Sequence, residues 1–155
     1  MTNHQRVGSI SNAHVGREFE AAALEYFYQV EKLQLTPSFS IDLGVAGAKS
    51  KAHRFDLGSH HPALLIECKS HNWTVTGNMP SAKVTVWNEA MYYFSLAPKN
   101  FRKVLFVLEA HHPLQEPETL AKYYTRINSH LIPSDVSIFE YNPITKNGYY
   151  VKVAF

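Results

Sequence analysis

Hydrophobic residues along this 155-residue chain recur with two different spacings, and the spacing changes several times between the two ends. Steps of three and four residues are typical of an amphipathic helix, whereas alternation or a short apolar run is typical of a strand. The helical spacing occurs in residues 12–33, 80–96 and 117–131. The strand patterns occupy residues 39–43, 53–58, 63–69, 102–110, 136–141 and 149–155. This order predicts one domain over residues 1–155 with an α/β (α+β) fold, a mixed central β-sheet flanked by helices.

Prolines, glycines and polar residues between these segments predict where the elements begin and end. Residues 1–11 are mostly polar, so we expect a loose lead-in before the first helix. Asn78 and Pro80 are typical of a helix start, with Asn78 as the cap and Pro80 in the first turn. Asn147-Gly148 is typical of a tight hairpin turn and is expected to join the last two strands.

Two carboxylates and a lysine lie on the strands predicted at residues 53–58 and 63–69. The second strand ends in Glu67-Cys68-Lys69, and residues two apart in a strand project from one face, so Glu67 and Lys69 share a side. If residues 59–62 form the loop, Gly58 opposes Ala63 and Glu67 is a diagonal neighbour of Asp56, about 7 Å away. Leu64, Ile66 and Cys68 then point the other way, into the core. A loop one residue longer or shorter would move Asp56 to the opposite face.

This group of side chains suits the hydrolysis of a phosphodiester bond. Two carboxylates can hold one hard cation such as Mg²⁺, which polarises the phosphate and acidifies a bound water. The Lys69 ammonium can orient that water or neutralise charge that develops on the phosphate oxygens. We therefore treat Asp56 and Glu67 as candidate metal ligands and Lys69 as a candidate catalytic residue.

The spacing of these residues resembles the signature of the PD-(D/E)xK nuclease superfamily. Asp56 is followed after ten residues by Glu67-Cys68-Lys69 at the end of an apolar strand, although Phe55 stands where the signature has proline. The resemblance implies a restriction endonuclease-like fold and a Mg²⁺-dependent deoxyribonuclease that accepts Mn²⁺ as a substitute. It also implies that DNA is the partner and that the main-chain carbonyl of Cys68 is a further metal ligand.

The first predicted helix carries a second part of the resemblance. Residues 16–20 read Gly-Arg-Glu-Phe-Glu and resemble the Gly-x-x-Phe-Glu pattern of several families in this superfamily. The resemblance gives Glu20 a role in binding the metal or its waters. Glu20 and Glu18 lie at opposite borders of the apolar face of the helix, so the periodicity leaves open which of them faces the site.

Several other polar and aromatic residues are candidates for contacting nucleic acid. In this superfamily the helix after the Glu-x-Lys strand often directs a polar side chain at the site, which makes Lys83 and Asn88 candidates. A surface role with no ligand stays open for each candidate. The full set is Lys49, Lys51, Arg54, His71, Trp73, Lys83 and Asn88.

Composition and charge narrow the function classes. A content of 45% hydrophobic and 18% charged residues is typical of a globular domain, and a net charge of +2 permits DNA binding without requiring it. No segment approaches the roughly 18 apolar residues of a membrane span, and no secretory signal is evident, so we expect a cytoplasmic protein with no membrane partner. No Gly-Lys-Ser/Thr phosphate loop is present, so we expect no nucleotide cofactor. The single cysteine, Cys68, excludes an internal disulfide.

Two alternatives to the nuclease stay open at this stage. A Glu-x-Lys triplet arises by chance about once in every two chains of this size, so a surface ion pair at a strand end is one alternative. The other alternative is a non-cleaving nucleic-acid-binding or assembly module with the same fold. If the chain does cut both strands of a duplex, it requires two sites and so a homodimer, for which Tyr149, Tyr150, Val151 and Phe155 offer apolar surface.

Overall fold

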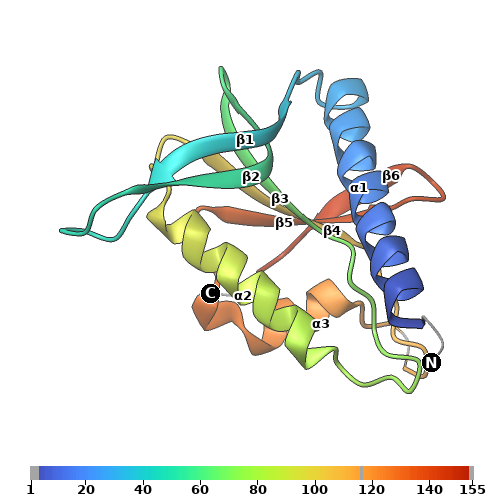
Figure 1. Cartoon of the computed structure of the whole chain (residues 1–155). Coiled ribbons are helices and arrows are strands. Elements are labelled where there is room, and N and C mark those ends of the chain that lie inside the picture. Colours follow the sequence, from blue (N-terminus) through green and yellow to red (C-terminus); the bar gives the residue numbers. More distant parts are fainter. Residues whose placement is uncertain (1–3, 116, 154–155) are drawn as a thin grey trace.

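One sheet of six strands, flanked by helices on both faces, makes up the core of the molecule (Figure 1). The structure is a computed structural model and describes residues 4–115 and 117–153. The strands lie in sequence order: β1 Thr36–Leu43, β2 Lys51–His60, β3 Ala63–Lys69, β4 Arg102–Leu108, β5 Val136–Asn142 and β6 Asn147–Val151. The helices are α1 His4–Gln29, α2 Ser81–Leu96, α3 Leu120–Ile127 and the 3₁₀ turn η1 Ser129–Leu131. Strands β3, β4 and β5 are parallel and the other neighbours antiparallel, so the predicted α/β class with a mixed sheet is confirmed.

The two faces of the sheet are covered by different helices. On one face α1 buries Phe19, Ala23, Tyr26 and Phe27 against the side of β3 that carries Leu64, Ile66 and Cys68. On the other face α2 buries Val84, Trp87, Met91 and Phe94, and α3 adds Leu120 and Tyr124. The inward orientation expected for Leu64, Ile66 and Cys68 is thus confirmed. The central strand β4 is buried on both sides, as its continuous apolar run predicts.

The first helix is longer at its start than its hydrophobic pattern indicates. It begins at His4, so residues 4–11, which we expected to be a loose lead-in, are helical; residues 1–3 lie outside the described part of the chain. This stretch contains no proline and only one glycine, Gly8, so the local sequence permits a helix there. Val15 and Val30, which fit the predicted stripe, are exposed.

Three other boundaries differ from the prediction. Asn78 does not cap α2: the N-cap is Pro80, with no side-chain cap bond, and Asn78 instead hydrogen-bonds within the preceding loop. The last turn spans residues 143–146, and Asn147 and Gly148 begin β6. Glycine is needed at 148 because a β-carbon there would collide with the main-chain oxygen of Glu140 on the neighbouring strand. The helix expected over 117–131 is shortened to α3 and η1.

The pairing of β2 with β3 positions the predicted site. Gly58 lies opposite Leu65 rather than opposite Ala63, because the loop is only the pair His61-Pro62 and not residues 59–62. The predicted register is therefore wrong by two residues. A shift of two preserves which residues share a face. The pairing ends at Leu57 and Ile66, so Asp56 and Glu67 are the next residue on each strand beyond the last pair.

The strand β2 turns over at Asp56. The pairing of β1 with β2 is interrupted where Ser38 faces Asp56, and Ser38 has a φ of 52°, a left-handed conformation that residues other than glycine rarely adopt. Phe55 packs on the α2 side of the sheet, whereas Leu57 packs on the α1 side. Alternate residues of a regular strand share a face, so this reversal shows a local distortion centred on Asp56.

Candidate active site

The site forms where β2 and β3 separate. Their pairing ends at Leu57 and Ile66, and from Glu67 to Lys69 the strand β3 continues only along β4. The Asp56 side chain crosses this gap, and its Oδ2 accepts a hydrogen bond of 2.7 Å from the main-chain N–H of Cys68. A side-chain carboxylate thus takes the place of the next ladder bond, which anchors Asp56 next to the end of β3.

Glu67 is a buried carboxylate that is only half satisfied. Its Oε1 accepts a hydrogen bond of 2.8 Å from Lys69 Nζ, and the two side chains are only 16% and 14% exposed. Its Oε2 is also buried, and among the described residues it has no hydrogen-bond partner. Burial, followed by the negative charge of Asp56, raises the pKa of Glu67, while Lys69 acts in the opposite direction. The ionised form of Glu67 therefore lowers the stability of the folded protein relative to the neutral form.

A third carboxylate, Glu20 on α1, lies near this pair. Burial and the charge of Asp56 raise the pKa of Glu20, and the charge of Lys69 opposes the effect. Glu18 is 65% exposed and pairs with His14 at 3.0 Å. The structure thus brings Glu20, and not Glu18, next to Asp56, which the helical periodicity alone had left open.

The donor atoms at the gap have the chemistry that Mg²⁺ prefers. Asp56 and Glu67 supply carboxylate oxygens, one of them buried and unshared, and Cys68 follows with a main-chain carbonyl on the same strand end. In the part of the chain that the structure describes, no three Asp, Glu, His or Cys side chains converge into a ready metal cage. Mg²⁺ commonly uses only one or two carboxylates and keeps several waters, so the donors present fit this ion.

A cavity of about 470 Å³ adjoins the lysine of the site. Lys69 and His71 line it from the end of β3 and the loop that follows, and Lys83 lines it from the first turn of α2. Trp73 closes one side and is fixed there, because its Nε1 donates a 3.0 Å hydrogen bond to the carbonyl of Ala110. Four of the residues predicted from the sequence are therefore brought together: Lys69, His71, Trp73 and Lys83.

The remaining nucleic-acid candidates lie elsewhere. Lys49 and Lys51 are exposed at the tip of the β1–β2 hairpin, which projects from the body of the molecule (Figure 1), and Arg54 is exposed on β2, two residues before Asp56. Asn88 does not line the cavity: its Oδ1 accepts a 2.8 Å hydrogen bond from the hydroxyl of Tyr124. This contact ties α2 to α3, so Asn88 has a structural role that the helix pattern did not indicate.

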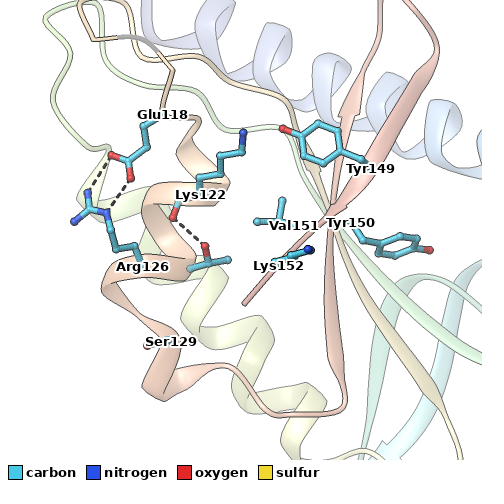
Figure 2. A pocket seen from close by; sticks show the side chains of 9 residues that line it. Glu118, Lys122, Arg126, Ser129, Tyr149, Tyr150, Val151 and Lys152 are labelled. Carbon is cyan, nitrogen blue, oxygen red and sulfur yellow. Dashed lines mark hydrogen bonds and ion pairs between the residues drawn. The ribbon is translucent and has the colours of Figure 1, made fainter. Parts of the chain in front are cut away.

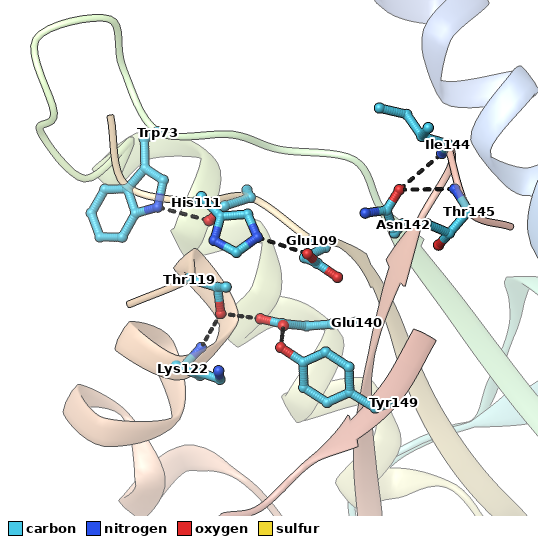
Figure 3. A network of polar contacts seen from close by, with 11 residues as sticks. Trp73, Glu109, His111, Thr119, Lys122, Glu140, Asn142, Ile144, Thr145 and Tyr149 are labelled. Atoms are coloured by element: carbon cyan, nitrogen blue, oxygen red, sulfur yellow. Dashed lines mark hydrogen bonds and ion pairs between the residues drawn. The ribbon is translucent and has the colours of Figure 1, made fainter. Parts of the chain in front are cut away.

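A second buried glutamate, Glu140 on β5, has both carboxylate oxygens hydrogen-bonded and serves as a comparison for Glu67. Figure 3 shows Thr119 and Tyr149 pointing at Glu140, and each donates a hydrogen bond to one of its two oxygens. Both oxygens of this fully buried side chain are satisfied. Glu67 differs from Glu140 in that its Oε2 has no such partner among the described residues. Asp135 has the same pattern, with Oδ2 paired with Lys103 at 2.6 Å and Oδ1 unshared, but what distinguishes Glu67 is the second carboxylate, Asp56, beside it.

A larger cavity, of about 660 Å³, lies between α3 and β6, away from the carboxylates (Figure 2). Lys122, Tyr149 and Lys152 line it, and Arg126 at its rim is held by Glu118 at 2.9 Å. None of the residues predicted for the site lines this cavity. The larger cavity is therefore separate from the predicted site at Asp56, Glu67 and Lys69.

The orientation of His71 is a structural feature that the sequence did not indicate. Its Nδ1 accepts a 3.0 Å hydrogen bond from the indole Nε1 of Trp87, a residue fully buried on α2. The two residues are sixteen apart in sequence and on different elements, so only the packing of α2 on the sheet reveals the contact. No spacing rule would have found it.

Comparisons with protein-family models, with curated proteins and with solved structures found no match for this chain. Among the described helices, none combines the length and the apolar character that crossing a membrane requires.

Proposed function

We propose that this protein is a Mg²⁺-dependent deoxyribonuclease that hydrolyses phosphodiester bonds of DNA and accepts Mn²⁺ as a substitute. The observation that carries the proposal is the Glu67 carboxylate, buried beside Asp56 with one oxygen unshared. Leaving a buried polar group without a partner costs about 1–3 kcal/mol. A role in binding a cation accounts for this cost at Glu67, because a second carboxylate, Asp56, lies beside it, whereas Asp135, whose Oδ1 is also unshared, lies beside Lys103 and Lys99.

Each residue at the gap has a distinct role in the proposed reaction. Asp56, Glu67 and the carbonyl of Cys68 would hold the metal, which when bound polarises the scissile phosphate and acidifies a water. The Cys68 N–H keeps Asp56 in place by occupying one of its oxygens. Lys69 supplies a positive charge that stabilises the phosphate oxygens as negative charge develops on them. Glu20, the third carboxylate, orients the attacking water and accepts its proton.

The exposed cations of the β1–β2 hairpin suit contacts with the DNA backbone. Lys49, Lys51 and Arg54 lie on one arm, and all three are exposed. Backbone contacts of this kind supply affinity that depends on salt and not on sequence. The proposal therefore assigns binding to the hairpin and chemistry to the gap.

One observation favours a second candidate, a nucleic-acid-binding module that does not cut. Lys69 is paired with Glu67 at 2.8 Å, so the ammonium is engaged by a carboxylate rather than presented to a substrate. In a nuclease the entry of metal and phosphate would have to separate this pair. In a binding module it could remain closed.

Cleavage of supercoiled plasmid tests the proposal and separates the two candidates. We expect the parent protein to nick or linearise the plasmid with Mg²⁺ or Mn²⁺ and to be inactive with EDTA. Asp56→Asn and Glu67→Gln should abolish cleavage, while Glu89→Gln, an exposed glutamate of α2, should not. Retarded migration of DNA without any cleavage under these conditions would reject the nuclease and leave the binding module.

A further inference from the structure

The cavity beside Lys69 is lined by positive and hydrogen-bonding groups and, among the residues that the structure describes, by no acid. Its charged lining residues are Lys69 and Lys83, and Ser70, Asn72 and His71 add polar atoms. The remaining lining is Val15 and Gly16 of α1 together with Cys68, Trp73 and Val86. Lys69 is paired with Glu67 at 2.8 Å, so Lys83 supplies the uncompensated positive charge of the lining, and a concave site with such a charge and hydrogen-bonding groups favours an anion.

The hydrogen bond from Trp87 fixes which nitrogen of His71 faces a ligand. An indole N–H can only donate, so His71 Nδ1 must accept and cannot carry a proton while this bond exists. In the neutral ring the proton is then on Nε2, which is the only nitrogen left to interact with a ligand. His71 therefore presents one donor of fixed direction, because Trp87 is itself held rigidly in the core.

The electrostatic surroundings keep this histidine neutral. Burial and the positive charges of Lys69 and Lys83 lower the pKa of His71. Protonation would also place an N–H opposite the indole N–H and break the bond to Trp87. The groups that face the ring are thus Trp87 from α2, Lys83 from the first turn of α2 and Lys69 from β3.

We propose that this cavity is a phosphate subsite of the nuclease, in which His71 Nε2–H donates to an oxygen of the phosphate next to the scissile one and Lys83 neutralises its charge. This assignment rests on the proposed function for the identity of the substrate, a DNA strand. The volume of the cavity, about 470 Å³, accommodates a phosphate with its attached sugar. The neighbouring Trp73 ring lies within the same lining and limits how the sugar can enter.

Histidine NMR of the metal-free protein tests the subsite without depending on cleavage. In EDTA, the long-range ¹H–¹⁵N spectrum should show His71 as the Nε2–H tautomer, identified by its absence in His71→Gln. Titration with inorganic phosphate, and with a short single strand of DNA, should shift its Nε2 resonance. Because a hydrogen bond to a charged group is lost, Lys83→Ala should weaken phosphate binding about tenfold. Lys99→Ala, which removes an exposed cation that does not line the cavity, should leave it unchanged.

Three results would overturn the subsite: a proton on Nδ1, no shift of His71 with either ligand, or equal phosphate affinity in the parent and Lys83→Ala. Lys83 is exposed, so its substitution does not disturb folding. Phosphate binding at His71 in a chain that cuts no DNA would keep the subsite and reject the nuclease. Cleavage without phosphate binding at His71 would do the reverse.

Discussion

Replacing Glu67 by glutamine should make the metal-free protein more stable while removing its activity. The pKa of Glu67 is raised in the fold, so its ionised form is held there at a net cost even with the attraction of Lys69 included. Glutamine has nearly the same shape, keeps an oxygen for the Lys69 ammonium and replaces the unshared Oε2 with an N–H₂ group. That group can donate to Asp56, so repulsion between two carboxylates becomes attraction.

The expected gain is about 1 kcal/mol in the free energy of unfolding, the net worth of one internal hydrogen bond. For a chain of this size that corresponds to a rise in Tm of about 2–4 °C. Urea unfolding in EDTA, followed by circular dichroism, measures the difference directly. Glu89→Gln is the matched control, because an exposed glutamate should change stability by less than about 0.5 kcal/mol.

A lower free energy of unfolding in Glu67→Gln than in the parent would refute this reasoning. If Glu67→Gln lost more than about 1 kcal/mol in EDTA, the pair with Lys69 would be a stabilising ion pair of the kind whose disruption is costly. Glu67 would then be part of the scaffold. Its unshared oxygen would no longer indicate a cation site.

Further outcomes follow from the same geometry. The pKa of Glu67 is raised in the folded protein, so ionising Glu67 lowers the free energy of unfolding as the pH rises through that pKa. Below the ordinary pKa range of glutamate the carboxyl is neutral in both the folded and the unfolded state. The extra stability of Glu67→Gln in urea unfolding should therefore disappear at such low pH. The histidines titrate in both the parent and Glu67→Gln, so their effect on the pH dependence of stability cancels in the difference between the two proteins. Lys69→Ala should slow single-turnover cleavage by about two to three orders of magnitude with little change in DNA affinity, whereas Lys51→Ala should weaken binding in a gel-shift assay and leave saturated chemistry near normal. Glu20→Gln should slow cleavage and Glu18→Gln should not, and equal rates for the two variants would remove Glu20 from the site. Light scattering should detect a dimer on DNA if both strands are cut, and a strict monomer would restrict the activity to nicking.

The proposed dimer surface is only partly described. Tyr149 and Tyr150 are exposed on the edge strand β6, while Phe155, which we expected on the same surface, lies outside the described residues. The hydroxyl of Tyr150 donates to Glu31 of α1 at 2.8 Å. A partner copy would therefore meet rings that are already held in place.

Strand periodicity predicted the faces of the paired part of β2 and β3, because side chains alternate with a period of two. The loop proved two residues shorter than expected, and an even error keeps each paired residue, up to Leu57 and Ile66, on its predicted face. Asp56 lies beyond the last pair, and its contact with the Cys68 N–H depends on the local distortion of β2. The apolar run of β3 similarly predicted the burial of Cys68, since its neighbours on that face all pack under α1.

Other parts of the site depend on contacts between distant elements and could not be predicted. The distortion at Asp56 requires the left-handed Ser38 on another strand, and no local pattern marks that serine. The choice of Glu20 over Glu18 depends on how α1 is rotated on the sheet, which the borders of its apolar face do not define. The contact of Trp87 with His71 depends on the packing of α2.

Anomalous diffraction from a crystal soaked in Mn²⁺ tests the central claim most directly. We expect an anomalous peak between the carboxylates of Asp56 and Glu67, with Lys69 released from its 2.8 Å contact with Glu67. Asp56→Asn should lose the peak under the same soak. If the parent crystal shows no peak and the ion pair of Glu67 with Lys69 stays closed, these residues are a buried strand-end ion pair, and the nuclease proposal is contradicted.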